Sequence, residues 1–430
     1  MEKFLIEGGN TLHGTIRIQS AKNACLPILA AIPLIEGRTI IRDVPKISDI
    51  DNLLHILAGF GVKIQWKNGD LHLDSTNLVM NEINVETAKK IRGSILVLGS
   101  LIGRFGSASL PFPGGCNIGA RPIDLHLNGL RDIGINVRER NGMINCIAKR
   151  AKSSAVYLDF PSVGATENII LASVRGSRSV KIINAAKEPE IVDLVNFLRK
   201  CGACIKGEGT DTVIIQGVKK LGGVDYTPIP DRINTGSYMC AVATVGGDVT
   251  LTNVIPEHNY SLIKKLINSG IDITYSTNSI RVVKDINNNK TKLQNSSIQT
   301  APYPGFSTDI QPQLGVFSSL KKGTTIVTEN LFENRFKVYE EIAKLGAKVC
   351  IKDRKATITG VQRLVGGERE NPVVVKANDL RAGVGLVIAG MAASGYTIVE
   401  RADIVARGHE DIVRDLAAVG ASISLICMEK

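Results

Sequence analysis

A cysteine in a loop rich in glycine and proline has the clearest chemical potential in this sequence of 430 residues. The loop reads PFPGGCNIGARPID from Pro111 to Asp124, so Cys116 follows two glycines and Arg121 stands five residues later. A thiol close to a cation loses its proton more readily and becomes useful for acid or nucleophilic catalysis. The loop therefore indicates a reactive thiol beside an anion-binding arginine, with simple packing of the cysteine as the alternative.

The composition favours small anionic ligands over nucleic acid. The formal net charge is +11, but the lysines and arginines are dispersed, and no run of five or more of them occurs. Aromatic residues make up only 4% of the chain, so stacking surfaces for bases are scarce. No window of about 20 apolar residues appears, and no membrane insertion is expected. Isolated cations suit small molecules that carry phosphate groups.

The remaining cysteines and the histidines do not indicate a site of their own. The eight cysteines are scattered, and the N-terminus, MEKFLIEGGN, lacks the apolar core of a signal peptide, so we expect reduced thiols and a cytoplasmic protein. Cys201 and Cys204 form a CxxC pair, but no second pair accompanies them. The six histidines show no ligand-like spacing, and no stretch matches a nucleotide fingerprint. We therefore expect no metal and no cofactor.

A short pattern recurs along the whole chain and predicts its architecture. A leucine or isoleucine is followed four residues later by a glycine and then by an apolar strand start, as in LAGFGVKI and LRDIGINV. The pattern is typical of an amphipathic helix that ends at a glycine with positive φ and leads into a strand. Six copies occur at spacings of 68 to 76 residues, and their glycines are Gly61, Gly134, Gly202, Gly270, Gly346 and Gly420.

Each copy is expected to form a β-α-β-α-β-β repeat of about 70 residues, with three repeats in each of two domains. The first helix of each repeat is almost wholly apolar and is predicted to be buried. Short strands, such as RTIIRDV and DVTLTNV, separate the two helices. Helix starts bind anions through their free N–H groups, and their charged residues are expected to ring a cleft: Lys22, Arg92, Arg121, Arg335, Arg381 and Arg407. For any one of these lysines and arginines taken alone, the alternative to anion binding is an ordinary solvated charge on the surface.

Nine stretches, taken together, resemble the enolpyruvyl transferases over essentially the whole chain. They are SAKNACLPILAA, PGGCNIGARPIDLHL, PSVGATENI, KEPEIVDLVNFL, PDRINTG, FSTDIQPQ, FENRF, ANDLRAG and ARGHEDI. The resemblance is closest to the members that act on UDP-N-acetylglucosamine. It implies an α/β (α+β) fold, a two-domain inside-out α/β barrel of six repeats. One domain would span 22–231, with the Cys loop and the nucleotide-sugar side, and the other 1–21 and 232–430, with the active site in the interdomain cleft.

The reaction that this resemblance implies moves the enolpyruvyl group of phosphoenolpyruvate to the 3′-hydroxyl of the amino sugar and releases phosphate. It proceeds by addition and then elimination, so it needs an acid, a base and a clamp for anions. Cys116 would be the general acid, able also to add to phosphoenolpyruvate and to react with thiol-alkylating epoxides. Asp309 would be the base, with a helix N-cap as its simpler alternative. The other residues with implied roles near the reacting centre are Lys22, Asn23, Arg121, Leu331, Glu333, Arg335, Asp379, Arg381 and Arg407.

The nucleotide sugar is expected mainly on the first domain. Arg92 and Arg121 would serve its charged groups, and the backbone N–H groups of Ser162, Val163 and Gly164 would bind the diphosphate. The residues implied to flank the uracil are Pro122, Ile123, Asp124 and Leu125. This chain has Phe160 where some relatives have lysine, and His409 where tyrosine is common.

Three other functions stay open at this point. A related enzyme could use shikimate 3-phosphate as its acceptor, although the sister family, 5-enolpyruvylshikimate-3-phosphate synthase, lacks the Cys loop. A regulatory paralogue without catalysis would not need Cys116, Lys22, Asp309 and Arg407 together. A nucleic-acid binder is disfavoured by the scarcity of aromatic residues and the dispersed charge.

Overall fold

The computed structural model describes residues 2–79, 86, 88, 92–114, 118–119, 122–148, 154–285 and 295–427. Cys116 and Arg121, which both have predicted roles, lie outside the described residues. The chain forms two compact units, which are described separately. We call residues 20–114 and 122–229 the Lys22 unit, and residues 2–19, 118–119 and 230–427 the Asp309 unit.

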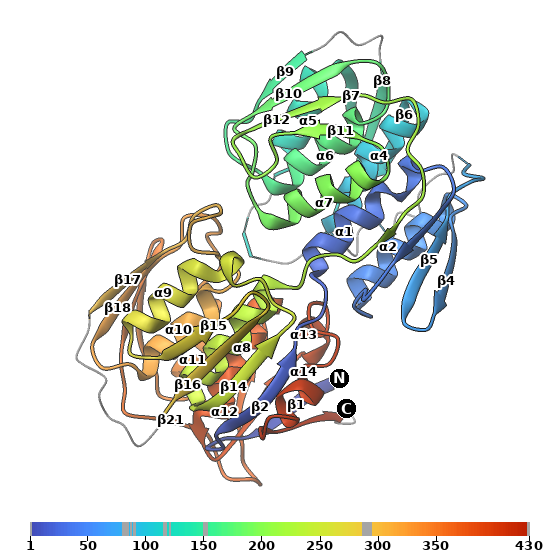
Figure 1. The fold of residues 1–430 in the computed structure, drawn as a ribbon. Helices are drawn as coiled ribbons and strands as arrows, with labels where there is room; N and C mark the ends of the chain where they lie inside the picture. Colours follow the sequence, from blue (N-terminus) through green and yellow to red (C-terminus); the bar gives the residue numbers. More distant parts are fainter. Residues whose placement is uncertain are drawn as a thin grey trace. The chain divides into compact units, whose positions relative to one another are not determined.

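Helices and strands alternate along the chain of the Lys22 unit (Figure 1). Its helices are α1 (Lys22–Ala31), η1 (Ile32–Leu34), α2 (Ser48–Gly59), η2 (Arg92–Ile95), α4 (Leu96–Phe105), α5 (Asp124–Asp132), α6 (Val163–Ser173) and α7 (Pro189–Lys200). Its strands are β3 (Arg38–Ile41), β4 (Lys63–Lys67), β5 (Asp70–Asp74), β6 (Ser107–Pro111), β7 (Ile135–Arg140), β8 (Met143–Ala148), β9 (Ser154–Tyr157), β10 (Ser179–Ile183), β11 (Cys204–Lys206), β12 (Thr212–Gln216) and β13 (Asp225–Tyr226).

The Asp309 unit repeats this alternation with its own core. Its helices are α8 (Arg232–Val245), η3 (Pro256–Asn259), α9 (Tyr260–Asn268), α10 (Gln311–Leu320), α11 (Lys337–Ala343), α12 (Leu380–Ala392), α13 (Ala402–Val405) and α14 (Ile412–Ala417). Its strands are β1 (Glu2–Glu7), β2 (Leu12–Arg17), β14 (Gly247–Thr252), β15 (Asp272–Tyr275), β16 (Ser279–Lys284), β17 (Ser296–Gln299), β18 (Thr324–Thr328), β19 (Lys348–Lys352), β20 (Lys355–Thr359), β21 (Leu364–Val365), β22 (Val373–Lys376), β23 (Ala393–Ser394), β24 (Tyr396–Glu400) and β25 (Ser422–Cys427).

Sheets of one pattern recur in both units. In the sheet β2-β14-β16-β15, the first pairing is parallel and the next two are antiparallel. The same order of pairings describes β17-β18-β20-β19 and β22-β24-β1-β25. In the Lys22 unit it describes β13-β3-β5-β4 and β9-β10-β12-β11. The sheet β6-β8-β7 has two antiparallel pairings among the described strands. The fold is therefore mixed α/β with internal repetition.

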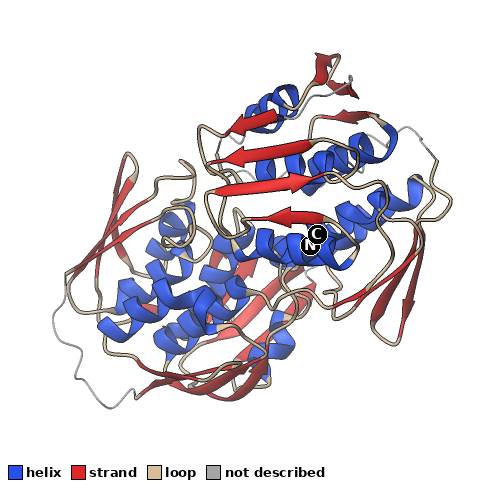
Figure 2. Ribbon diagram, turned by 45° about the horizontal axis from the view of Figure 1, so that its top comes forward, coloured by secondary structure: helices blue, strands red, loops and turns tan. Residues whose placement is uncertain are grey.

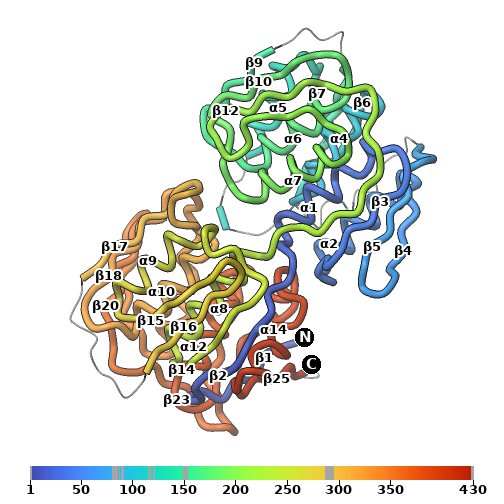
Figure 3. Tube along the Cα trace, viewed as in Figure 1, coloured from blue at the N-terminus to red at the C-terminus, as the bar shows by residue number. Residues whose placement is uncertain are grey.

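Strands from distant parts of the sequence complete three of these sheets. Strand β2 pairs with β14, and β1 lies between β24 and β25, so the first residues of the chain belong to the sheets of the Asp309 unit. Figure 3 shows these N-terminal strands beside the C-terminal part of the chain. In the Lys22 unit, β13 pairs with β3. In each unit, strands far apart in the sequence therefore pair within one sheet.

The apolar helices form the cores of the units, as their sequences predict. Helices α8, α10 and α12 pack against one another, and nearly all their residues are buried. In the Lys22 unit, α4 packs against both α1 and α6. Figure 2 shows strands of the Asp309 unit along the outside of its helices. None of the helices among the described residues is long and apolar enough to span a membrane.

The six repeated glycines all adopt the backbone conformation predicted from the sequence. Their φ angles are 89° at Gly61, 83° at Gly134, 105° at Gly202, 89° at Gly270, 91° at Gly346 and 103° at Gly420. Each follows the end of an amphipathic helix by two or three residues. Residues with a Cβ atom rarely adopt this left-handed region, so the glycines end the helices and turn the chain into the next strand.

Gly202→Ala is expected to lower the free energy of unfolding by about 1–2 kcal/mol, the cost of a left-handed residue with a side chain. A Cβ atom there would contact nothing within 4 Å, so the effect isolates the backbone conformation. The matched control is Gly59→Ala, which lies in helix α2 of the same unit and also has open space. It is expected to stabilise slightly, because alanine favours helices. Urea unfolding measures both, and equal effects of the two substitutions would contradict the prediction.

Candidate active site

Asp309 lies just before helix α10 and is held by two arginines. Arg335 Nη2 donates a hydrogen bond to Asp309 Oδ1 at 2.7 Å, and Arg381 Nε lies 3.4 Å from Oδ2. The Asp309 side chain remains 26% exposed, whereas those of Arg335 and Arg381 are 2% and 5% exposed. The N-cap residue of α10 is Ile310, with no side-chain cap bond, so the simpler alternative for Asp309 is wrong. Its carboxylate is thus both fixed and partly accessible.

The charge of Arg335 is maintained by its acidic neighbours. Burial alone would lower the pKa of this guanidinium, but the carboxylates of Asp309 and Asp379 outweigh burial and raise its pKa above the ordinary value. Arg335 therefore remains a cation although its side chain is almost fully buried. Two cations predicted for anion binding, Arg335 and Arg381, are indeed brought together, and in this structure they bind a carboxylate of the protein itself.

Asp379 has a structural role that the sequence analysis missed. Its Oδ1 accepts hydrogen bonds from the backbone N–H groups of Arg381 and Ala382 at 2.9 and 3.0 Å, which makes it the N-cap of α12. The residue is 4% exposed. The sequence does contain a signal for this cap that could have been used, an aspartate immediately before the apolar helix LRAGVGLVIAG. This cap orients the first turn of α12, from which Arg381 reaches Asp309.

The Arg407 segment is fixed by contacts on both sides of Gly408. The Nδ2 atom of Asn234, on α8, donates a hydrogen bond to the Gly408 carbonyl at 3.1 Å. A Cβ atom at Gly408 would lie 2.7 Å from Leu380 Cδ2, on α12. Gly408 therefore packs closely between two core helices, and the backbone of Arg407 is placed by its neighbour. The Arg407 side chain is partly exposed.

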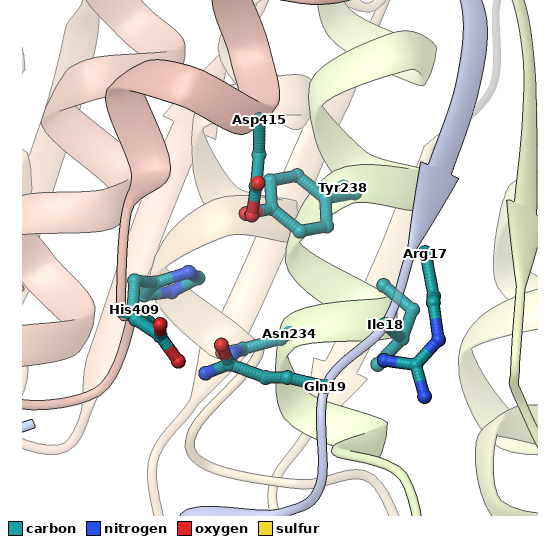
Figure 4. Close-up of a pocket in the computed structure, with 8 residues that line it drawn as sticks. Arg17, Ile18, Gln19, Asn234, Tyr238, His409 and Asp415 are labelled. Carbon is teal, nitrogen blue, oxygen red and sulfur yellow. The ribbon is translucent and has the colours of Figure 1, made fainter. Parts of the chain in front are cut away.

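A small polar cavity of about 10 Å³ borders this segment (Figure 4). The His409 and Tyr238 rings meet edge to face at 5.9 Å, and the Tyr238 hydroxyl donates a hydrogen bond to Asp415 Oδ2 at 2.9 Å. Burial and the negative charge of Asp415 raise the Tyr238 pKa well above its ordinary value, so the hydroxyl stays a donor. Figure 4 shows the Asn234 and Gln19 amides on the opposite side of the cavity from Asp415.

In the Lys22 unit, Lys22 is the first residue of α1 and is almost buried. Its Nζ atom donates a hydrogen bond to Asp49 Oδ2 at 3.1 Å. Lys22, which is predicted to bind phosphoenolpyruvate, is thus paired with Asp49 in this structure. To bind an anionic ligand, the ammonium group of Lys22 would have to exchange this carboxylate for the ligand. Asn23, next along α1, is partly exposed.

Residues predicted for the nucleotide line one cavity of about 370 Å³. Arg92 Nη2 donates a hydrogen bond to the Pro122 carbonyl at 3.2 Å, which joins two of them directly. The other lining residues are Phe112, Pro113, Ile123, Asp124, Leu127, Arg131 and Glu139. Leu125, by contrast, packs against the core of this unit. Arg131, which pairs with Glu139 at 2.9 Å, was not predicted, because an exposed arginine on an amphipathic helix gives no sequence signal.

The start of α6 offers fewer free N–H groups than predicted. The Ser162 N–H donates to the Phe160 carbonyl at 2.7 Å, so it is already used. The Ser162 hydroxyl oxygen caps the helix by accepting from the Ala165 N–H. The N–H groups of Val163 and Gly164 stand in the first helical turn, where no intrahelical acceptor exists, and they fit the predicted anion contact. Phe160 itself is exposed.

The described part of the Cys loop contacts the segment that carries Glu333. The Asn334 N–H donates to the Ile118 carbonyl at 3.2 Å. A Cβ atom at Gly119 would lie 2.6 Å from Glu333 Oε2, so the absence of a side chain permits this close approach. The contact links the end of the Cys loop to the loop that carries Leu331, Glu333 and Arg335.

Solved structures of enolpyruvyl transferases share this fold. The enolpyruvyl transferase NikO from Streptomyces tendae matches with a TM-score of 0.88, covering 100% of this chain and 99% of its own, at 23% identity. EPSP synthase from Acinetobacter baumannii matches with a TM-score of 0.76, covering 99% of this chain and 100% of its own, at 17% identity. These likenesses establish a mixed α/β fold of the enolpyruvyl transferase type.

Sequence comparisons establish the family. The family model of EPSP synthase (3-phosphoshikimate 1-carboxyvinyltransferase) matches residues 6–416. UDP-N-acetylglucosamine 1-carboxyvinyltransferase 2 of Caldanaerobacter subterraneus is 44% identical over 423 residues, 98% of this chain and 99% of that protein. The protein of the same name from Carboxydothermus hydrogenoformans is 44% identical over 426 residues, 99% of this chain and 100% of that protein. The chain belongs to the EPSP synthase family of enolpyruvyl transferases, so the resemblance seen in the sequence is confirmed.

Proposed function

We propose that this protein transfers the enolpyruvyl group of phosphoenolpyruvate to the 3′-hydroxyl of UDP-N-acetylglucosamine and releases phosphate, the first committed step of peptidoglycan biosynthesis. The observation that carries the proposal is the 44% identity, over almost the whole chain, to proteins named for this activity. The proposal includes a reducing, cytoplasmic location, which suits the seven free cysteines among the described residues.

The proposed chemistry adds the sugar oxygen to C2 of phosphoenolpyruvate while a proton reaches its methylene carbon. Elimination then removes a proton from the new methyl group and expels phosphate from C2. Cys116 is the proposed acid in the first step, and Asp309 is the base that takes the proton of the sugar hydroxyl. Asp309 is supported in this role by its fixed and partly exposed carboxylate. Asp379 is proposed to assist proton movement in addition to capping α12.

The anion clamp is proposed to draw on both units. Lys22, Arg121 and Arg407 would bind the phosphate and carboxylate of phosphoenolpyruvate, since paired cations stabilise charge that develops in the transition state. Asn23 would contact both substrates, Leu331 would contact the sugar, and Glu333 would line the mouth of the site together with Arg335. Arginine suits carboxylate and phosphate groups because its planar fork donates two parallel hydrogen bonds. The nucleotide contacts are proposed from the predicted residues Arg92, Arg121, Pro122 to Leu125, Val163 and Gly164. Ser162 is left out, because its N–H already donates to the Phe160 carbonyl.

The finer architecture is also a proposal. Six β-α-β-α-β-β repeats, three per domain, would form an inside-out α/β barrel, with domains at 22–231 and at 1–21 with 232–430. The repeated sheet pattern supports these repeats, and so do the six glycines of positive φ.

Phosphate release from phosphoenolpyruvate tests the function most directly. We expect release with UDP-N-acetylglucosamine as the acceptor and none with shikimate 3-phosphate. The reverse preference would assign the sister activity, and release with neither acceptor would favour a regulatory paralogue. Cys116→Ser is expected to lower kcat by about 10²–10⁴-fold, the range for loss of a general acid. A thiol-alkylating epoxide is expected to modify the wild type at Cys116 and to spare the serine variant.

A further inference from the structure

A buried carboxylate, Glu329, follows strand β18 and holds two segments of the candidate site. The residue is only 1% exposed. Its Oε1 accepts hydrogen bonds from the Thr300 hydroxyl at 2.8 Å and from the backbone N–H groups of Leu331 and Phe332 at 2.9 and 3.2 Å. Its Oε2 accepts a hydrogen bond from the Thr308 hydroxyl at 2.8 Å. One side chain thus binds four donors from three stretches of chain.

Each oxygen of Glu329 serves a different part of the site. Through Thr308, which is itself buried, Oε2 fixes the residue immediately before Asp309. Through Leu331 and Phe332, Oε1 fixes the beginning of the loop that ends at Arg335. The loop is further tied down because the Asn330 N–H donates to the Thr300 hydroxyl oxygen at 2.9 Å. Glu329 therefore sets the backbone on both sides of the Asp309–Arg335 pair.

Burying the Glu329 carboxylate costs free energy, and this cost indicates that the hydrogen bonds of Glu329 have a role in the protein. A carboxylate buried without partners is strongly destabilising, and it is tolerated only when its lone pairs are satisfied. The four donors are neutral, and hydrogen bonds to a charged acceptor are stronger than those between neutral groups. The negative charge also contributes to the raised pKa of Arg335, after the larger effects of Asp309 and Asp379. A neutral side chain could not accept all four bonds.

We propose that Glu329 is a positioning residue for the reaction, acting through Thr308 on Asp309 and through the 331–335 loop on Arg335. This inference rests on the proposed function of Asp309 as the base. Catalysis depends on reacting groups being held close to their productive geometry, and a misplacement of about 1 Å can cost 10²-fold in rate. Glu329 does not touch the substrates in this proposal, so its loss should affect kcat more than KM.

Substitution of Thr308 tests the proposal without removing the buried charge. Thr308→Val keeps the shape of the side chain but removes the donor, and it is expected to lower kcat by about tenfold with little change in either KM. Thr308→Ser keeps the hydroxyl and is expected to retain kcat. The matched control is Thr244→Val on α8, where a buried hydroxyl donates to the Cys240 carbonyl at 2.6 Å. It should lose comparable stability while keeping kcat.

The proposal is overturned if Thr308→Val and Thr244→Val both retain the wild-type kcat, or if Thr308→Ser loses as much activity as Thr308→Val. A second readout does not need turnover. Glu329→Gln is expected to loosen the 331–335 loop, so that trypsin cleaves after Arg335, which is buried in the wild type. Resistance equal to that of the wild type would contradict the proposed hold on the loop. If the wild type releases no phosphate, the proposed function is wrong. The comparison of trypsin cleavage between the wild type and Glu329→Gln would still show whether Glu329 holds the 331–335 loop.

Discussion

Asp309→Asn is expected to lower kcat by about 10³-fold, within the range for loss of a general base. The amide keeps the shape of the carboxylate but cannot take the proton of the sugar hydroxyl. It also leaves the buried guanidiniums of Arg335 and Arg381 without the carboxylate that joins them. Steady-state phosphate release at saturating substrates measures the rate, and thermal unfolding measures the change in stability.

The stability change needs its own control, because an inactive variant is informative only if it folds. Breaking a fully buried ion pair costs about 3–5 kcal/mol. We expect a smaller loss for Asp309→Asn, since the Asp309 side chain is 26% exposed. The control is Asp248→Asn, which breaks a solvent-exposed pair with Arg281 in the same unit. It should leave kcat unchanged. A value of kcat above about one tenth of the wild type in Asp309→Asn would remove the aspartate from the role of base.

The local structure of the repeats was predictable because neighbouring residues determine it. A glycine after an amphipathic helix specifies a left-handed residue and a turn into a strand, and all six such glycines have φ between 83° and 105°. The wholly apolar helices were likewise predicted to be buried, and α8 and α12 are. The spacing of apolar residues and glycines within one repeat is enough to predict its helices, its turns and the burial of its apolar helix.

The pairings between distant residues were not predictable from the sequence. Asp309 meets Arg335 and Arg381 because α10, the loop before α11 and the start of α12 converge in three dimensions. The resemblance named these residues, but it did not show that the two arginines bind the aspartate. Glu329 was missed altogether, since a single glutamate at the end of a strand resembles an ordinary surface residue. Its hydrogen bonds depend on Thr300 and Thr308, which the fold brings beside it.

The stability of the Lys22 unit is expected to fall as the pH rises through neutrality, and Glu167 is the main cause. This residue of α6 is 4% exposed, and burial, reinforced by the charges of Glu190 and Glu188, raises its pKa well above its ordinary value of 4.5. The unfolded chain loses this proton near pH 4.5, whereas the folded unit keeps it. Between these two pKa values, the free energy of unfolding therefore falls by about 1.4 kcal/mol for each pH unit.

The effect of Glu167 can be separated from that of its neighbour Asp193 by the choice of pH. Burial raises the Asp193 pKa from 3.8 to about 6, so its contribution to the slope ends near that pH. Urea unfolding of the wild type and of Glu167→Gln should be compared between pH 6.5 and 8, and the unfolding free energy of the wild type should fall relative to that of the variant as the pH rises. The glutamine variant should be the more stable at pH 8.

Glu208→Gln, in the same unit, provides the control of opposite sign. Burial alone would raise the Glu208 pKa, but its hydrogen bonds and the charge of Arg199 together hold the pKa below its ordinary value, so its contribution to stability is lost only in acid, below about pH 4.5. Its substitution should therefore lower stability by a constant amount between pH 6.5 and 8. A constant difference for Glu167→Gln over the same range would mean that Glu167 is already ionised in the folded unit. In that case burial does not dominate the Glu167 pKa.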